Sequence, residues 1–213
     1  ETEAESIATV SAVEAEGESP GPGRGENGKA TPSSASASGG RPSWTTFSVR
    51  TTVPSDHFYL TTAAGATGSS VGRRFTKRVQ KEWKLLRRNL PPNMTVLGYE
   101  SRMDLMRAIM VGPRGTPYAD CLFVFDIELP VDKYPLEPPR VHFWSFGERL
   151  NPNLYESGKV CLSLLGTWSG DQNEQWNPAK SSIVQVLVSL QALVLVEEPY
   201  FNEPGHETDR GTE

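Results

Sequence analysis

A single alternating stretch, "DCLFVFDIELP" at residues 120–130, decides the fold. Its apolar side chains share one parity: Cys121, Phe123, Phe125, Ile127 and Leu129. Asp126 and Glu128 take the other parity. Successive side chains of a β-strand point to opposite faces, so the pattern predicts a half-buried strand. We therefore expect Cys121 in the hydrophobic core and the two carboxylates on the solvent face.

Further short runs lie on both sides of this stretch. "MTVLGY" (94–99) and "DLMRAIMVGP" (104–113) precede it, and a run containing His142 follows it. The connections are short, which favours antiparallel neighbours, because a parallel pair needs a crossover of about a dozen or more residues. We expect a four-stranded antiparallel meander.

Two amphipathic segments flank the strands. "RRFTKRVQKEWKLLRRN" (73–89) has one apolar helical face, formed by Phe75, Val79, Trp83 and Leu86. Pro91 and Pro92 end it. In "SSIVQVLVSLQALVLV" (181–196) a serine pair can cap a long helix with a second such face, formed by Ile183, Leu187, Leu190 and Val194. The fold class expected is α+β.

Composition divides the chain into three parts. Residues 1–43 are rich in Ser, Gly, Ala, Pro and Glu, which indicates a disordered linker or tail. Residues 44–71 carry aromatic residues that we expect to dock on the domain: Trp44, Phe47, Phe58 and Tyr59. The folded domain is expected at 72–213. Because the first residue is not Met, we expect the chain to be part of a longer protein.

Charge and cysteine content exclude several classes. The chain has 213 residues and a net charge of −5, yet residues 73–88 alone carry eight basic side chains and one acidic. An acidic protein partner fits better than nucleic acid, because the rest of the chain would repel phosphates. No secretory signal or apolar run long enough for a membrane span is present. Two cysteines are too few for a disulfide framework, so we expect a cytoplasmic or nuclear location, or both.

Cys161 lies in an irregular stretch, "NPNLYESGKVCLSLLGTW" (151–168), of the kind that carries chemistry on a rigid scaffold. Two interpretations stay open: a small buried residue, or a nucleophile. A cysteine hydrolase would also need a histidine base, and His57, His142 and His206 are the three available.

The motifs around Cys161 resemble, in order, those of the ubiquitin-conjugating enzymes. That family's signature runs Gly-Pro, Pro-Tyr, Tyr-Pro-x-x-Pro-Pro, His-Pro-Asn and the catalytic Cys. The matching stretches are "GPRGTPYADCLFVFDIELPVDKYPLEPPRVHFW" (112–144), "NPNLYESGKVCLSLL" (151–165) and "QWNPAKSSIVQVLVSLQALV" (175–194). The stretches "SRMDL" (101–105) and "EEPYFNEPG" (197–205) are most similar to the large O-type enzymes, which combine conjugating and ligase activity. The giant inhibitor-of-apoptosis conjugating enzymes are a near second.

The resemblance implies a reaction and a set of site residues. Cys161 would accept ubiquitin as a thioester from an activating enzyme and pass it to lysines of protein substrates, with no metal or organic cofactor. Asn153, eight residues earlier, matches the family's oxyanion donor, and Glu203 matches an acid that orients the incoming amine. The alternative is a catalytically weak ubiquitin-binding variant that acts as an interaction module.

The resemblance also assigns a partner surface and several departures. The basic face of the first helix would meet an acidic ubiquitin-like domain of the activating enzyme, through Lys77, Arg78, Lys81, Lys84 and Arg88. Asn151 replaces the family histidine. An insert, "GTWSGDQNE" (166–174), adds Asp171 and Glu174 near Cys161 and moves Trp176 to 15 residues after it. Two helices that normally follow are expected to be missing.

Overall fold

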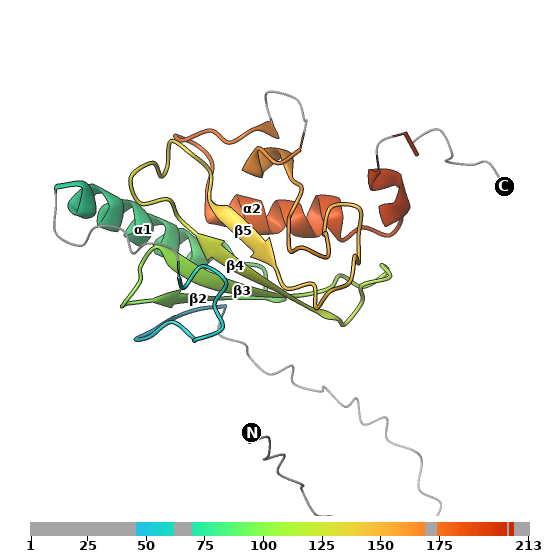
Figure 1. Ribbon diagram of the computed structural model, residues 1–213, viewed down its shortest axis with the longest axis horizontal. Helices are drawn as coiled ribbons and strands as arrows, with labels where there is room; N and C mark the ends of the chain where they lie inside the picture. The colour runs from blue at the N-terminus through green and yellow to red at the C-terminus, as the bar shows by residue number, and fades with distance from the viewer. Residues whose placement is uncertain (1–45, 62–69, 169–173, 204, 207–213) are drawn as a thin grey trace, which may run out of the picture. The chain divides into compact units, whose positions relative to one another are not determined.

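The computed structural model describes residues 46–61, 70–168, 174–203 and 205–206 (Figure 1). The described residues belong to one compact unit, Pro42–Glu213. The predictions made for residues 1–43, Trp44 and Asp171 lie outside the described residues.

Five strands form one sheet in the order β1-β2-β3-β4-β5. They are β1 (Phe47–Arg50), β2 (Met94–Tyr99), β3 (Leu105–Val111), β4 (Leu122–Glu128) and β5 (Arg140–Phe143). The strands from β2 to β5 pair antiparallel, which confirms the predicted meander. β1 is an addition to that prediction and pairs parallel with β2, with Phe47 opposite Val96.

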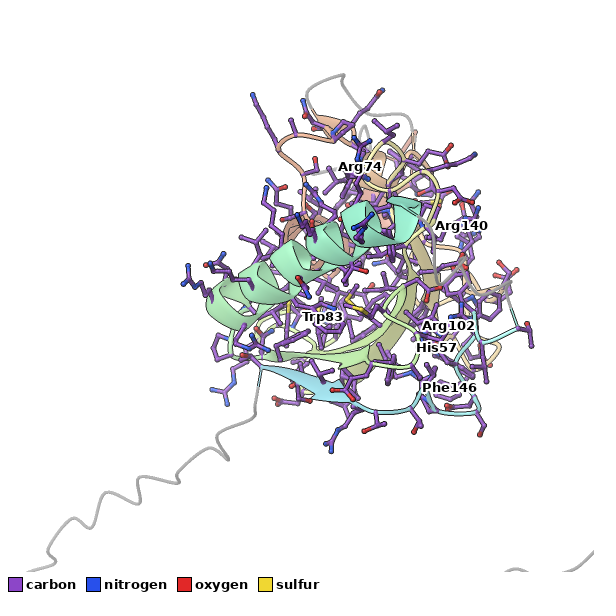
Figure 2. All side chains as sticks on the ribbon, turned by 90° about the vertical axis from the view of Figure 1, so that its left-hand side faces the viewer. His57, Arg74, Trp83, Arg102, Arg140 and Phe146 are labelled. Atoms are coloured by element: carbon purple, nitrogen blue, oxygen red, sulfur yellow. The ribbon has the colours of Figure 1, made fainter. Side chains whose placement is uncertain are left out.

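Helix α1 (Ser70–Asn89) covers one side of the sheet (Figures 1 and 2). Phe75, Val79 and Leu86 are buried on its inner face, as the spacing predicts. Trp83 is partly buried and lies near Phe47 of β1, with 6.0 Å between the ring centroids. The amphipathic pattern thus fixes which face of α1 meets the core.

Helix α2 (Ile183–Ser189) continues as a π-helical turn, η3 (Leu190–Val194). Ser182 caps its start in a capping box with Gln185, because each side chain accepts a hydrogen bond from the other residue's backbone N–H. The predicted face is almost fully buried: Ile183, Leu187, Leu190 and Val194. Two short 3-10 helices, η1 (Ser163–Leu165) and η4 (Pro199–Asn202), lie on either side of this segment in the chain.

We call residues 46–61 the N-terminal strap. The strap begins with β1, and the residues after β1 lie on the face of the sheet that is opposite α1. Along β3, Met106 and Ala108 point into the core, so Arg107 between them faces outward. Arg107 pairs with Asp126 of β4, which pairs with His142 of β5. The strap contacts all three of these outward residues.

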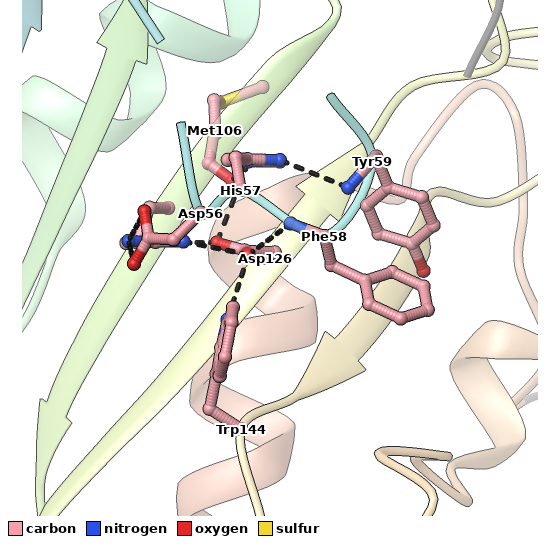
Figure 3. A network of polar contacts seen from close by, with 8 residues as sticks. Asp56, His57, Phe58, Tyr59, Met106, Asp126 and Trp144 are labelled. Carbon is pink, nitrogen blue, oxygen red and sulfur yellow. Dashed lines mark hydrogen bonds and ion pairs between the residues drawn. The ribbon is translucent and has the colours of Figure 1, made fainter. Parts of the chain in front are cut away.

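This covering segment overturns the expectation that Asp126 and Glu128 face solvent. Asp126 is fully buried, and its carboxylate accepts hydrogen bonds from Arg107, from Trp144 Nε1 and from the backbone N–H of Phe58 (Figure 3). Glu128 is buried beside Arg140. β4 is therefore buried on both of its faces, because the strap, about seventy residues earlier in the chain, covers the outer one. The alternation of residues along a strand cannot predict such a contact.

The expectation that Cys121 lies in the core is also wrong. Cys121 is an exposed free cysteine. β4 begins one residue later, and Asp120 has a positive φ of 61° in the preceding turn. Cys121 N–H donates to Tyr118 O in that turn. Alternation therefore starts only at Leu122, and the parity of Phe123 does not extend back to Cys121.

Candidate active site

The loop that follows β5 folds back on itself before it reaches Cys161. Isolated bridges join Asn151 to Leu154, Leu154 to Val160, and His142 of β5 to Lys159. Leu154 is fully buried and anchors the loop in the core. The loop is therefore tied both to the core and to a sheet strand.

Asn151, the residue that replaces the family histidine, braces the turn. Its Nδ2 donates to Tyr118 Oη and to Val194 O, each at 2.7 Å, and its Oδ1 accepts from Asn153 N at 2.7 Å. It is only 3% exposed. One amide thus links the loop to the Tyr118 turn and to the end of η3, and the substitution leaves the loop well held.

Cys161 is a free cysteine whose backbone is bonded to Asn153 in both directions. Cys161 N donates to Asn153 O at 2.8 Å, and Asn153 Nδ2 donates to Cys161 O at 3.2 Å. Asn153 Oδ1 is buried without a hydrogen-bond partner. Since Cys161 is only 2% exposed, the nucleophile expected from the sequence is recessed in the loop.

Thr167 holds the chain on the far side of Cys161. Its hydroxyl donates to Val160 O at 2.7 Å and accepts from Leu162 N at 3.0 Å. These bonds close a small ring around Cys161, so the residues immediately before and after the cysteine are fixed relative to each other. Sequence reasoning gave Thr167 no role, because the signal is a single hydroxyl within the insert.

Tyr155 lies beside the thiol. The negative charge that Cys161 carries when it is ionised raises the pKa of Tyr155 above its ordinary value, and burial adds to this effect. A phenol with a raised pKa keeps its proton in neutral solution and can donate to a thiolate. Sequence reasoning did not single out Tyr155 as a site residue.

Arg149 joins three parts of the site. Its guanidinium lies 4.6 Å from the centroid of the Tyr155 ring, donates to Pro152 O, and forms an ion pair of 2.9 Å with Glu203. Both partners of this ion pair are more than a third exposed. Arg149 therefore connects Glu203 to Tyr155 in the loop that carries Cys161, and the Glu203 carboxylate is engaged by a cation that the sequence did not reveal.

An open cleft adjoins this ion pair. It is lined by Arg149, Leu150, Asn151, Pro152, Tyr200, Glu203 and His206. His206 stacks on Tyr200, with 4.2 Å between the ring centroids. The cleft therefore lies at the edge of the loop that carries Cys161.

Two of the three histidines are engaged away from the thiol, and His206 stacks on Tyr200 in the cleft. His57 Nε2 donates to Met106 O at 3.0 Å, and His142 stacks on Phe58 with 3.5 Å between the ring centroids. Within the described part of the chain, no hydrogen bond joins an imidazole to Cys161. This arrangement lacks the Cys–His pair that a cysteine hydrolase requires.

The basic face of α1 is smaller than the sequence indicated. Lys77, Lys81, Lys84 and Arg88 are exposed. Arg78 instead pairs with the fully buried Glu82 at 2.8 Å and donates to Ser181 O. Arg78 therefore joins α1 to the start of α2 and is not part of the exposed face.

Glu174, the last residue of the insert, is exposed, and Trp176 just after it is partly buried. Trp176 Nε1 donates to Pro135 O at 2.7 Å, and its ring lies 5.8 Å from that of Tyr134.

Among the described residues, no helix is long and apolar enough to cross a membrane. Nor do the described His, Cys, Asp and Glu side chains form a cluster of three that could hold a metal ion.

Comparison with known proteins agrees with the geometry. The family model described as "Ubiquitin-conjugating enzyme" matches residues 78–211. The putative ubiquitin-conjugating enzyme E2 38 of Arabidopsis thaliana is 54% identical over 158 residues, which are 74% of this chain and 48% of that protein. The probable ubiquitin-conjugating enzyme E2 25 of the same plant is also 54% identical, over 74% of this chain and 26% of that protein.

A human relative and a solved structure extend this likeness. The dual E2 ubiquitin-conjugating enzyme/E3 ubiquitin-protein ligase BIRC6 is 44% identical over 164 residues, 74% of this chain but 3% of that protein. The structure of human ubiquitin-conjugating enzyme E2 G1 overlays with a TM-score of 0.50 and 23% identity, over 59% of this chain and 97% of that one. That overlay supports the fold alone. The chain spans less than half the length of the two plant relatives, and its match with the family model shows that it belongs to the ubiquitin-conjugating enzyme family.

Proposed function

We propose that this chain accepts ubiquitin as a thioester on Cys161 and transfers it to lysines of protein substrates. In the first step the Cys161 sulfur attacks the ubiquitin thioester held by an activating enzyme. A new carbon–sulfur bond forms, and the activating enzyme's cysteine leaves as a thiolate. The observation that carries the proposal is the site around Cys161, which combines a held backbone, a phenol at the thiol and an adjoining cleft.

In the second step a lysine nitrogen attacks the thioester on Cys161. The carbon–nitrogen bond forms, the bond to the Cys161 sulfur breaks, and the proton of the attacking amine passes to solvent. This attack passes through a tetrahedral intermediate whose oxyanion needs a hydrogen-bond donor. A positioned amide donor lowers the activation free energy by about 2.7–4 kcal/mol in such sites. One N–H of the Asn153 amide bonds to Cys161 O, which leaves its second N–H for the oxyanion.

The Tyr155 hydroxyl supports the leaving thiolate. A neutral phenol that donates a hydrogen bond to sulfur stabilises the thiolate released in the second step. Its raised pKa keeps it in the donating form, because the thiolate charge itself opposes ionisation of the phenol. The Tyr155 hydroxyl would then stabilise negative charge on the Cys161 sulfur, and the Asn153 amide would stabilise it on the oxyanion.

Glu203 is the acid that orients the incoming amine in this proposal. Its carboxylate pairs with Arg149 in the resting chain, so the amine must compete with the guanidinium for it. An exposed ion pair of this kind is worth only about 0.2–1 kcal/mol, so a lysine that enters the cleft can replace it.

The proposal also covers the activating enzyme, the ligase and the compartment. The exposed lysines of α1 attract the acidic surface of the activating enzyme, mainly by raising the rate of encounter. We also propose a hybrid type that needs no separate ligase, in line with the printed name of the human relative. A cytoplasmic or nuclear setting suits both free cysteines.

One experiment tests the class and its subtype. The chain is incubated with activating enzyme, ubiquitin and ATP, with and without a protein substrate, and products are separated with and without thiol reductant. A band lost on reduction supports the thioester, and a reductant-resistant band without an added ligase supports the hybrid type. Without either band, the proposal fails.

A further inference from the structure

We propose that the N-terminal strap is a positioning element of the active site, in which Phe58 supports His142, and His142 supports the turn at Gly158 ahead of Cys161. The inference rests on the proposed function of Cys161. The strap precedes residues 78–211 that match the family model, so membership of the family does not account for it.

The strap is fixed to the sheet on both sides of Phe58. His57 Nε2 bonds to Met106 O at 3.0 Å, and Phe58 N donates to Asp126 Oδ2 at 2.8 Å (Figure 3). Further along, Arg102 donates to Leu60 O. The backbone of Phe58 is therefore held at a defined place on the outer face of the sheet.

Asp126 is the centre of this attachment. Burial alone would raise its pKa, but hydrogen bonds from Arg107, Phe58 N and Trp144 outweigh burial and hold the pKa below its ordinary value. Arg107 also pairs with Asp56 of the strap at 3.0 Å. An ionised carboxylate with several donors is a strong anchor, so the strap is a built feature of the domain.

Phe58 uses this fixed backbone to stack on β5. Its ring lies 3.5 Å from the His142 ring, centroid to centroid, with an angle of 4° between the planes. Phe58 remains 51% exposed, so the ring is not a core residue in the usual sense. Its ring also meets that of Tyr59 edge to face, with 5.0 Å between the centroids, and the imidazole is its partner on the sheet.

His142 passes this contact on to the active-site loop. A Cβ on Gly158 would overlap the His142 ring, so only glycine lets the loop approach so closely. Gly158 O accepts from Phe143 N at 2.8 Å, and Gly158 N donates to Tyr155 O at 2.9 Å. Gly158 thus closes the turn that carries Tyr155, the phenol whose pKa the charge of an ionised Cys161 raises.

The strap and the loop also line one pocket. Tyr59 lines a pocket together with Val141 of β5 and with Val160 and Thr167, the residues that flank Cys161. We therefore expect removal of the strap to loosen both the Tyr155 turn and the Thr167 ring.

The test compares Phe58→Ala with Phe58→Trp, which keeps a stacking ring. Two controls are matched: Phe146→Ala truncates another exposed aromatic that is 85% exposed, and Val79→Ala destabilises the core at the inner face of α1 without altering Phe58 or His142. Each protein is assayed well below its own melting temperature. One readout is single-turnover discharge of preformed ubiquitin thioester to free lysine. The other is alkylation of Cys161 by iodoacetamide, followed by mass spectrometry, with exposed Cys121 as the internal reference.

We expect Phe58→Ala to slow discharge by about 10-fold or more, since small misplacements of reacting groups are costly. Alkylation of Cys161 relative to Cys121 should rise, because the loop opens. Phe58→Trp and both controls should stay close to the unchanged protein in both readouts. If Phe58→Ala is not folded at the assay temperature, Phe58→Leu takes its place with the same expectations.

The inference is overturned if the Phe58 variant matches the unchanged protein in discharge and alkylation, or if Val79→Ala shows the same losses. Failure of the unchanged protein to form a thioester would instead refute the proposed function. The alkylation ratio needs no ubiquitin, so it then decides the role of the strap alone.

Discussion

Asn153 and Cys161 are joined by two hydrogen bonds, one from the backbone of Cys161 to the backbone of Asn153 and one from the Asn153 amide to Cys161 O. The pair spans a loop whose inner turn carries Tyr155 and Gly158. Asn153 therefore shapes the loop, and only one of its two amide hydrogens is used in this pair of bonds.

We predict that Asn153→Ala slows discharge of the Cys161 thioester to free lysine by about 100- to 1,000-fold. Charging should fall much less, because the activating enzyme contributes its own site to the first exchange. Thioester should then accumulate. Single-turnover discharge and a charging time course measure the two steps separately. Equal loss in both steps would mean that Asn153 only holds the loop.

We predict that Arg149→Gln speeds discharge to free lysine by up to about fivefold, the equivalent of one exposed ion pair. The substitution frees the Glu203 carboxylate for the incoming amine. Glu203→Gln should slow discharge, and the double variant should be no faster than Glu203→Gln alone. If Arg149→Gln speeds discharge equally when Glu203 is already Gln, the guanidinium and the amine do not compete for the Glu203 carboxylate.

Charge reversal of Lys77, Lys81 and Lys84 should slow charging, most strongly at low salt, where steering is least screened. A control that reverses Arg50, Arg114 and Lys180, which are also exposed, changes the net charge equally and should have a smaller effect. Initial charging rates are measured over a series of salt concentrations. Identical salt dependence of the two triple variants would show that α1 contributes only net charge.

Stability should fall as the pH drops below about 6.5, the ordinary pKa of histidine. Burial lowers the pKa of His57 in the folded chain, and Nδ1 accepts from Tyr59 N, which requires a neutral ring. The unfolded chain therefore takes up this proton first, and the stabilisation is full above pH 6.5 and is lost toward the lower folded pKa. Urea unfolding at pH 7.5 and 5.5 measures the slope, which His57→Gln should flatten. An unchanged slope would assign the effect to His142, whose pKa burial also lowers.

The spacing of apolar residues along the sequence predicted those features that depend on neighbouring residues. The buried faces of α1 and α2 follow from helical spacing, because each helix meets the core with one stripe. The role expected of Cys161 came from the order of motifs around it. The burial of Asp126, the exposure of Cys121 and the pairing of β1 with β2 could not be predicted in this way, since each depends on a distant segment or on where a strand begins. Arg149 escaped notice for the same reason: its partner Glu203 is 54 residues away.

The intact mass of the charged protein shows directly which cysteine carries ubiquitin. The unchanged chain, Cys161→Ser and Cys121→Ser are each incubated with activating enzyme, ubiquitin and ATP, and intact masses are recorded before and after thiol treatment. Our account predicts one ubiquitin on the unchanged chain and on Cys121→Ser, removed by thiol, and no thiol-sensitive adduct on Cys161→Ser. A thiol-sensitive adduct on Cys161→Ser equal to that on the unchanged chain would contradict it.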